Sequence, residues 1–210
     1  MFAKPAVALA ASAALALAGC SVSLSGPTPD PSAPPASSSP AQSSLGNTYT
    51  NDKYGFSFDY PNQFRQIKAT DWRAQAGAGS AESVAFFDTS GSKAGGQYRD
   101  AMVVNVYQLS QPITGENISL AESELEDSVL PQLRASDPTM QIGALQPVEI
   151  NGIPGFVSDV SFVTDGTTIK SRAYFLFAGD IEYQILVQAA DSKWAALQPT
   201  FEQMVQSFRA

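Results

Sequence analysis

Histidine is absent from this chain of 210 residues, and cysteine occurs once, at position 20. Without histidine there can be no Ser-His-Asp triad, no Cys-His pair and no imidazole ligand for zinc. One cysteine cannot form a disulfide within the chain or a site of several thiolates. This composition still allows catalysis by carboxylates or by a Ser-Lys nucleophile, but no motif in the sequence indicates either. We therefore expect no enzyme activity, no metal site and no cofactor.

Basic residues are also scarce. The chain holds 12 Lys and Arg against 20 Asp and Glu, which gives a formal net charge of −8. Binding to nucleic acid, or to anionic lipid through charge, depends on clustered Lys and Arg. The composition therefore argues against a nucleic-acid partner and against a polybasic contact with the membrane.

The N-terminal segment carries a targeting signal. Lys4 precedes an apolar run from Pro5 to Ala18, which is the pattern of a secretory signal peptide. A membrane-spanning helix needs about 20 apolar residues, so this run is too short to be one. The run ends in Leu17-Ala18-Gly19-Cys20, which resembles the lipobox of bacterial lipoproteins. Residues 1–19 are thus predicted to be a lipoprotein signal peptide.

The lipobox resemblance implies a covalent anchor on Cys20. In that family a diacylglycerol is attached to the cysteine sulfur, the chain is cut just before it, and the new amine is acylated. One acyl chain holds a protein on a bilayer only marginally, whereas two or three make the anchor stable. The resemblance implies a protein held at the extracytoplasmic face of the cell membrane. An ordinary signal peptide followed by an incidental cysteine is the alternative.

Residues 20–47 are predicted to be the lipidated cysteine and a disordered tether. Proline, serine and alanine dominate this segment, and large apolar side chains are almost absent. Such a composition cannot bury enough surface to offset the entropy of ordering. At about 3.1 Å per residue in an extended polyproline conformation, the tether reaches well beyond the lipid headgroups.

Residues 48–210 are predicted to form one globular domain, because their length suits a single domain and no second linker interrupts them. Alternating aromatic and polar residues predict a strand from Tyr54 to Pro61. Alternation and hairpin signals predict the other strands at 48–50, 84–87, 101–109, 146–150, 153–163, 167–178 and 181–189. Met102, Val104 and Val106 are expected to share one face.

Two helices are expected. The first begins at a capping box formed by Ser119 and Glu122, and Pro131 bends or shortens its end. The second is C-terminal: Asp191 or Ser192 caps it, and Pro199 starts or kinks its main part. Its apolar face is expected to consist of Phe201, Met204, Val205 and Phe208. The predicted fold class is α+β, an antiparallel β-sheet flanked by helices.

Three segments of the domain resemble the PsbP-like α/β/α sandwich superfamily. They are Tyr-Gly-Phe-Ser-Phe-Asp-Tyr-Pro at 54–61, Ile-Asn-Gly-Ile-Pro-Gly at 150–155, and the C-terminal pattern Phe201-x-x-Met204-Val205-x-Ser207-Phe208. The resemblance covers nearly all of residues 48–210 and is greatest to the bacterial lipoprotein branch, which includes LpqN-type envelope lipoproteins. It implies a non-enzymatic binding or assembly module, and it supplies no catalytic residue.

Four side chains are candidates for a binding surface: Trp72, Trp194, Lys170 and Arg172. Both tryptophans lie beside polar residues near the expected ends of elements, and exposed aromatic residues are enriched at interfaces. Lys170 and Arg172 alternate on an expected strand and could present a small basic spot on an acidic protein. The alternatives are tryptophans that cover an edge of the core and cations on a solvated strand face.

Two functions of different class follow from these features. The first is a lipid-anchored, non-enzymatic binding or assembly module that meets a protein partner of the cell envelope through an exposed sheet surface framed by helices. The second is a carrier or sensor that holds a small apolar ligand in a sheet–helix cleft lined by aromatic side chains. Glu122 and Glu126 share a helical face, but a helix surface offers too few oxygens for calcium.

Overall fold

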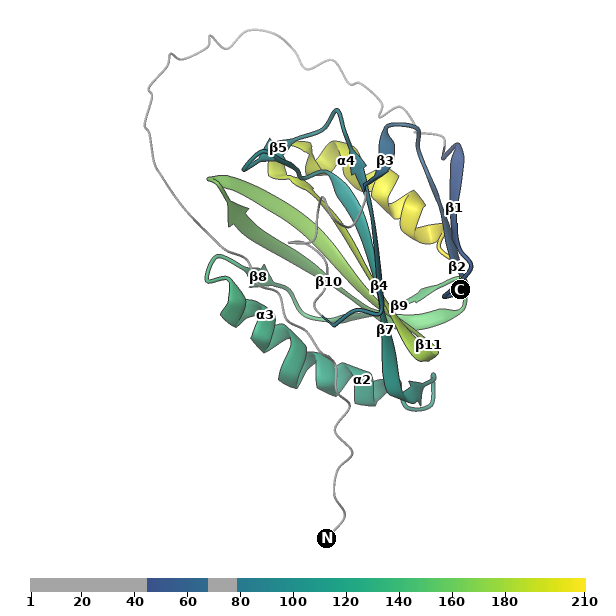
Figure 1. Ribbon diagram of the computed structural model, residues 1–210. Coiled ribbons are helices and arrows are strands. Elements are labelled where there is room, and N and C mark those ends of the chain that lie inside the picture. Colours follow the sequence, from purple (N-terminus) through teal and green to yellow (C-terminus); the bar gives the residue numbers. More distant parts are fainter. Residues whose placement is uncertain (1–44, 68–78) are drawn as a thin grey trace, which may run out of the picture.

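The computed structural model describes residues 45–67 and 79–210 (Figure 1). The predicted lipobox, Leu17 to Cys20, and the candidate residue Trp72 lie outside these ranges. The first strand, β1 (Asn47–Asn51), begins one residue before the predicted start of the domain. Within the described ranges, no helix has the length and apolar character needed to cross a membrane.

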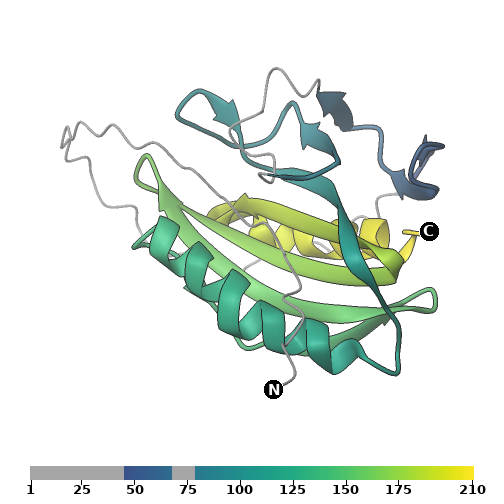
Figure 2. The same ribbon diagram turned by 60° about the horizontal axis from the view of Figure 1, so that its bottom comes forward.

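The predicted α+β class is confirmed by a mostly antiparallel sheet with helices on both faces (Figures 1 and 2). Its strand order is β3-β4-β7-β11-β10-β8, and β9 also pairs with β10. The strands of this sheet are β3 (Phe64–Ile67), β4 (Glu82–Asp88), β7 (Ala101–Ile113), β8 (Gln141–Ile142), β9 (Gln146–Ile150), β10 (Ile153–Thr164) and β11 (Thr167–Ala190). Two small hairpins pair β1 with β2 (Phe56–Tyr60) and β5 (Lys93–Ala94) with β6 (Gln97–Tyr98).

The prediction of two strands at 167–178 and 181–189 is confirmed, and the two are continuous in the single element β11. The first half of β11 pairs with β10 and the second half pairs with β7. The two halves lie side by side, because Ser171 Oγ donates a hydrogen bond to the Val187 carbonyl (2.9 Å). Gly179 has a positive φ of 65°, as the first central residue of a type II′ hairpin turn requires, so the chain reverses at Gly179-Asp180.

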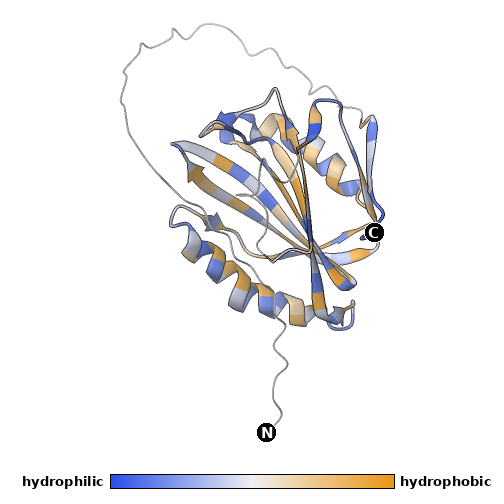
Figure 3. Cartoon of the chain, in the orientation of Figure 1, coloured by the Kyte–Doolittle hydropathy of each residue, from blue (hydrophilic) through white to orange (hydrophobic). Residues whose placement is uncertain are grey.

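Helices cover the two faces of the sheet, as Figures 1 and 2 show. On one face, called the α4 face here, helix α4 (Asp191–Gln206) and the β1–β2 hairpin enclose the larger core cluster. On the other face lies a continuous helical segment of α2 (Ile118–Glu124), a π-helical turn η2 (Leu125–Val129) and α3 (Leu130–Ser136). Apolar and hydrophilic residues alternate along both helical segments in Figure 3, as amphipathic helices require.

The two predicted apolar faces are confirmed. Met102, Val104 and Val106 are fully buried and point to the α4 face. The C-terminal residues of the second helix are also in this cluster: Phe201, Met204, Val205 and Phe208. The sheet and α4 therefore share one core, which fixes the position of α4 over β11 and beside β2.

The predicted helix starts need correction. Helix α2 begins at Ile118, so Ser119 lies inside the first turn and cannot cap it. The N-cap residue is Asn117, and its side-chain oxygen accepts a hydrogen bond from the Thr114 amide (2.7 Å). Helix α4 follows Ala190, which has no side chain able to cap.

The two prolines do not end the helices that contain them. Pro131 follows the π-helical turn η2, and the helix continues to Ser136. A proline ring crowds the carbonyl four residues earlier and offers no N–H, so the wider turn before it relieves a clash that would otherwise break the helix. Pro199 lies inside α4, which is continuous from Asp191 to Gln206.

The motif at residues 150–155 joins the β9–β10 hairpin to the end of α4. Asn151 (φ 49°) and Gly152 (φ 83°) are both left-handed, as a two-residue hairpin turn requires. The Asn151 side-chain amide donates to the carbonyls of Gln206 (2.8 Å) and Phe208 (2.7 Å). A Cβ on Gly155 would collide with the Phe175 carbonyl on β11. The motif thus has a structural role, and it anchors the helix that forms one wall of the candidate site.

Candidate functional site

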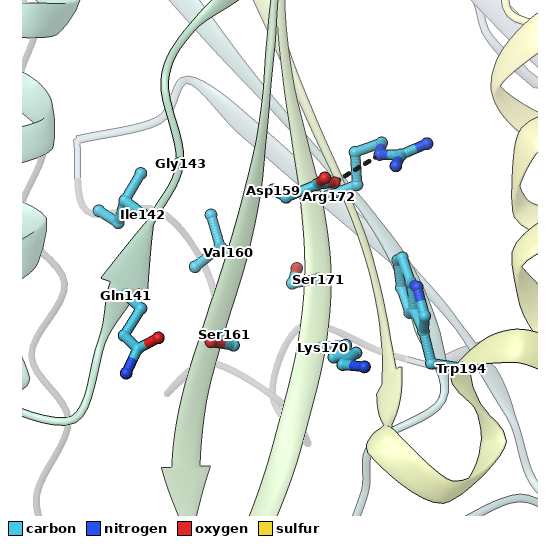
Figure 4. A pocket seen from close by; sticks show the side chains of 10 residues that line it. All are labelled: Gln141, Ile142, Gly143, Asp159, Val160, Ser161, Lys170, Ser171, Arg172 and Trp194. Carbon is cyan, nitrogen blue, oxygen red and sulfur yellow. Dashed lines mark hydrogen bonds and ion pairs between the residues drawn. The ribbon is translucent and has the colours of Figure 1, made fainter.

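An open groove lies on the α4 face, between α4 and the short edge strand β8 (Figure 4). Its volume is about 470 Å³. The floor consists of side chains from paired residues, which point to the same face of a sheet. One row runs from Gln141 through Ser161 to Lys170, and the next pairs Asp159 with Arg172. The groove is therefore a strip of exposed sheet beside a helix.

Trp194 forms the wall of the groove on the α4 side (Figure 4). Its side chain is half-buried, and its ring lies 6.1 Å from that of Phe201 in a tilted arrangement. The residue therefore covers an edge of the core and also lines the groove. The core contact holds the indole in place, so little conformational freedom is lost if a ligand packs against it.

The two cations of the groove do not form a basic spot, because carboxylates hold both. Lys170 Nζ lies 2.7 Å from Asp191 Oδ1. Arg172 donates through Nε to Asp159 Oδ1 (2.7 Å) and through Nη1 to Glu202 Oε1 (3.4 Å). The hydrogen bond to Asp159 raises the pKa of Arg172 above its ordinary value. The two cations are thus paired with three carboxylates, of which Asp159 itself lines the groove.

Three of the four predicted site residues, Lys170, Arg172 and Trp194, come together in this groove. Whether they bind a partner stays a prediction, and Trp72 lies outside the described residues. The sequence analysis missed Gln141, Ser161 and Asp159. Asp159 and Ser161 alternate on an expected strand, but their place beside Lys170 and Arg172 depends on the β10–β11 register. Gln141 joins them only because β8 pairs with β10.

Outside the groove, Glu182 is unusual because it is a buried acid, and it lies on the opposite face of the sheet. Its side chain is 0% exposed, and neither carboxyl oxygen has a hydrogen-bond partner. Burial raises the pKa of this carboxyl from 4.5 to about 8. Tyr107 is its cross-strand neighbour on β7. Burial, together with the nearby Glu182, raises the pKa of Tyr107 to about 12. The sequence does not indicate that Glu182 is buried; it shows only an acid between Ile181 and Tyr183 on an expected strand.

A third polar cluster, around Asp100, has a structural role. Its carboxylate is 1% exposed and accepts hydrogen bonds from the amides of Ser92 (2.7 Å) and Ala190 (3.1 Å). Arg99 donates to the Ala94 carbonyl (2.9 Å through Nη2). These bonds connect the β5–β6 hairpin to the start of α4. The charged groups are satisfied within the fold.

The aromatic side chains of the domain pack mainly against one another. Phe58 and Phe86 lie edge to face at 5.1 Å, and Phe56 stacks on Phe208 at 5.6 Å. Trp194 is the single aromatic residue among those that line the groove. Among the described residues, the exposed large hydrophobic side chains are Leu120 (54%) and Val163 (37%). The aromatic side chains of the described residues therefore belong mainly to the core.

Over residues 45–67 and 79–210, no three or more His, Cys, Asp or Glu side chains gather in a way that could hold an ion.

Comparison with known proteins identifies the class of fold. The chain is similar to cyanobacterial PsbP from Synechocystis, with 14% identity, 78% of this chain and 91% of that one covered, and a TM-score of 0.53. It is similar to LpqN, involved in cell envelope biogenesis of Mycobacterium tuberculosis, with 11% identity, 80% and 86% covered, and a TM-score of 0.51. The domain therefore has a PsbP-like fold.

A third similar structure comes from Bacteroides thetaiotaomicron, with 15% identity and a TM-score of 0.49. The alignment covers 79% of this chain but 48% of the Bacteroides protein, so the chain spans about half of its length. No protein-family model and no curated protein matches the sequence. At these identities the likeness concerns the fold alone.

Proposed function

We propose that this protein is a lipid-anchored, non-enzymatic binding or assembly module on the extracytoplasmic face of the cell membrane, and that it binds another protein of the cell envelope. The convergence of Trp194, Lys170 and Arg172 on one groove carries the proposal. The lipobox resemblance at Cys20 supports the anchor. The fold shared with LpqN, a protein involved in cell envelope biogenesis, supports the setting.

The geometry of the groove suits recognition better than chemistry. Its charged side chains are held in ion pairs, and an aromatic wall stands beside a floor of hydrogen-bonding groups. A general base or nucleophile has to be free to exchange a proton or attack a substrate. Pre-positioned side chains instead reduce the entropy lost when a partner binds.

Capture of the partner from crosslinked membranes tests this function. The full-length wild type should repeatedly recover the same envelope protein. Trp194→Ala should recover at least about tenfold less of it, because a buried aromatic anchor dominates the energy of most interfaces. Leu120→Ala, on the opposite face of the sheet, is the matched control and should recover as much as the wild type.

Two results would overturn the proposal. One is repeated recovery of no partner by the wild type, with a stoichiometric lipid present in extracts of the purified protein. The other is equal recovery by Trp194→Ala and the wild type, provided that both unfold at the same temperature.

A further inference from the structure

The groove has the size of a site for a small ligand or a short chain segment. Its volume is about 470 Å³, which lies within the range of about 300–1,000 Å³ found for sites that enclose small ligands. Interfaces between folded surfaces usually have an apolar centre, whereas polar and charged side chains make up much of the lining of the groove. The groove therefore suits a short segment of a partner better than a whole folded surface.

The charges of the groove do not favour a charged segment. A partner carboxylate would have to displace Asp191 from Lys170, or Asp159 and Glu202 from Arg172. A partner Lys or Arg would meet carboxylates that already hold a cation. Because the ion pairs are formed before binding, neither a positive nor a negative side chain of the partner finds an unpaired opposite charge in the groove.

The floor does offer free groups to an uncharged ligand. The side chains of Gln141 and Ser161 make no hydrogen bond within the described part of the chain. An amide and a hydroxyl each donate and accept, so they match the main-chain and side-chain groups of a neutral polar segment. They lie side by side through the β8–β10 register, opposite the indole of Trp194 (Figure 4).

We infer that the groove binds a short, uncharged, polar segment of the partner protein, which hydrogen-bonds to Gln141 and Ser161 and packs an apolar side chain on Trp194. This inference rests on the proposed function and specifies which part of the partner is recognised. The ion pairs of Lys170 and Arg172 hold these side chains in place, and neither cation binds an anion of the partner.

The two tryptophans of the chain make a direct test available. In Trp72→Phe, Trp194 is the only indole, so its fluorescence reports occupancy of the groove. Full-length protein in detergent is titrated with a short peptide of Ser, Thr, Asn and Gln that carries one proline. Peptides of the same length rich in Lys or in Glu, and an uncharged oligosaccharide, are titrated in parallel. The uncharged peptide should bind most tightly, and its affinity should change less than about twofold with salt, because screening acts on charges.

Two further variants, made in Trp72→Phe, test the two hydrogen-bonding groups of the floor. Gln141→Ala removes one of these groups, and the affinity for the uncharged peptide should fall about tenfold, which corresponds to about 1.4 kcal/mol. Ser161→Ala should change the affinity in the same direction. Unchanged affinity in both variants would overturn the inference.

Tighter binding of a charged peptide or of the oligosaccharide would also overturn it. These failures are distinguishable from failure of the proposed function. If membrane capture recovers a partner that depends on Trp194 but the uncharged peptide does not bind, the inference falls and the function stands. If no partner is recovered from membranes, the function falls, and the inference falls with it.

Discussion

Glu182→Gln is expected to raise the free energy of unfolding at alkaline pH and to flatten its dependence on pH. In the folded protein, burial holds the proton on Glu182 up to about pH 8, whereas the unfolded chain releases it near pH 4.5. Between these values the folded state binds more protons, so stability falls as the pH rises. The loss by alkaline pH is at most about 5 kcal/mol, since one unit of pKa corresponds to about 1.4 kcal/mol.

Urea denaturation between about pH 4 and pH 9 measures this effect. The variant should be several kcal/mol more stable than the wild type at the alkaline end and nearly equal to it at the acidic end, where Glu182 is neutral in both states. Glu149→Gln on β9, an exposed acid, is the matched control and should keep the wild-type slope. The same pH slope in Glu182→Gln and the wild type would show that Glu182 is not a buried neutral acid.

Cys20→Ala is expected to move nearly all of the protein from the membrane to the soluble fraction. Each buried CH₂ contributes about 0.8 kcal/mol to membrane binding, so loss of two or three acyl chains removes the anchor. Membranes are washed with high salt, which strips proteins held by charge, and the fractions are compared by immunoblot. Ser21→Ala, one residue further on, is the control and should stay with the membrane.

The mass of the wild-type N-terminal peptide provides an independent check of the anchor. It should correspond to a chain that begins at Cys20 and carries acyl groups. An unmodified thiol at this position, or a Cys20→Ala protein that stays in the washed membrane pellet, would contradict the lipoprotein prediction.

The sequence predicts the layers of the fold well, because each layer follows from local periodicity. Alternation at Met102, Val104 and Val106 indicates a face of the sheet, and Phe201 with Met204 indicates a face of the last helix. The turn at Gly179-Asp180 is predicted correctly for the same reason, because hairpin signals are local. The order of the strands is not predicted, because the pairing of β7 with the second half of β11 joins segments far apart in the sequence.

The candidate site could be predicted only in part, for the same reason. Lys170, Arg172 and Trp194 stand out by residue type, but their neutralisation by acids cannot be read along the chain. Asp159 pairs with Arg172 through a strand register, and Glu202 reaches it from α4. The burial of Glu182 cannot be predicted from the sequence, because it depends on which elements cover that part of the sheet.

Crosslinking from a defined position in the groove tests the central claim most directly. A photoreactive amino acid replaces exposed Gly143, which lines the groove, or exposed Glu126, on the helix that covers the opposite face. We predict that, in the intact envelope, irradiation at position 143 gives one recurrent protein adduct that disappears when Trp194→Ala is added, and that position 126 does not give it. The same adduct from both positions, or from position 126 alone, would contradict the assignment of this groove as the recognition site.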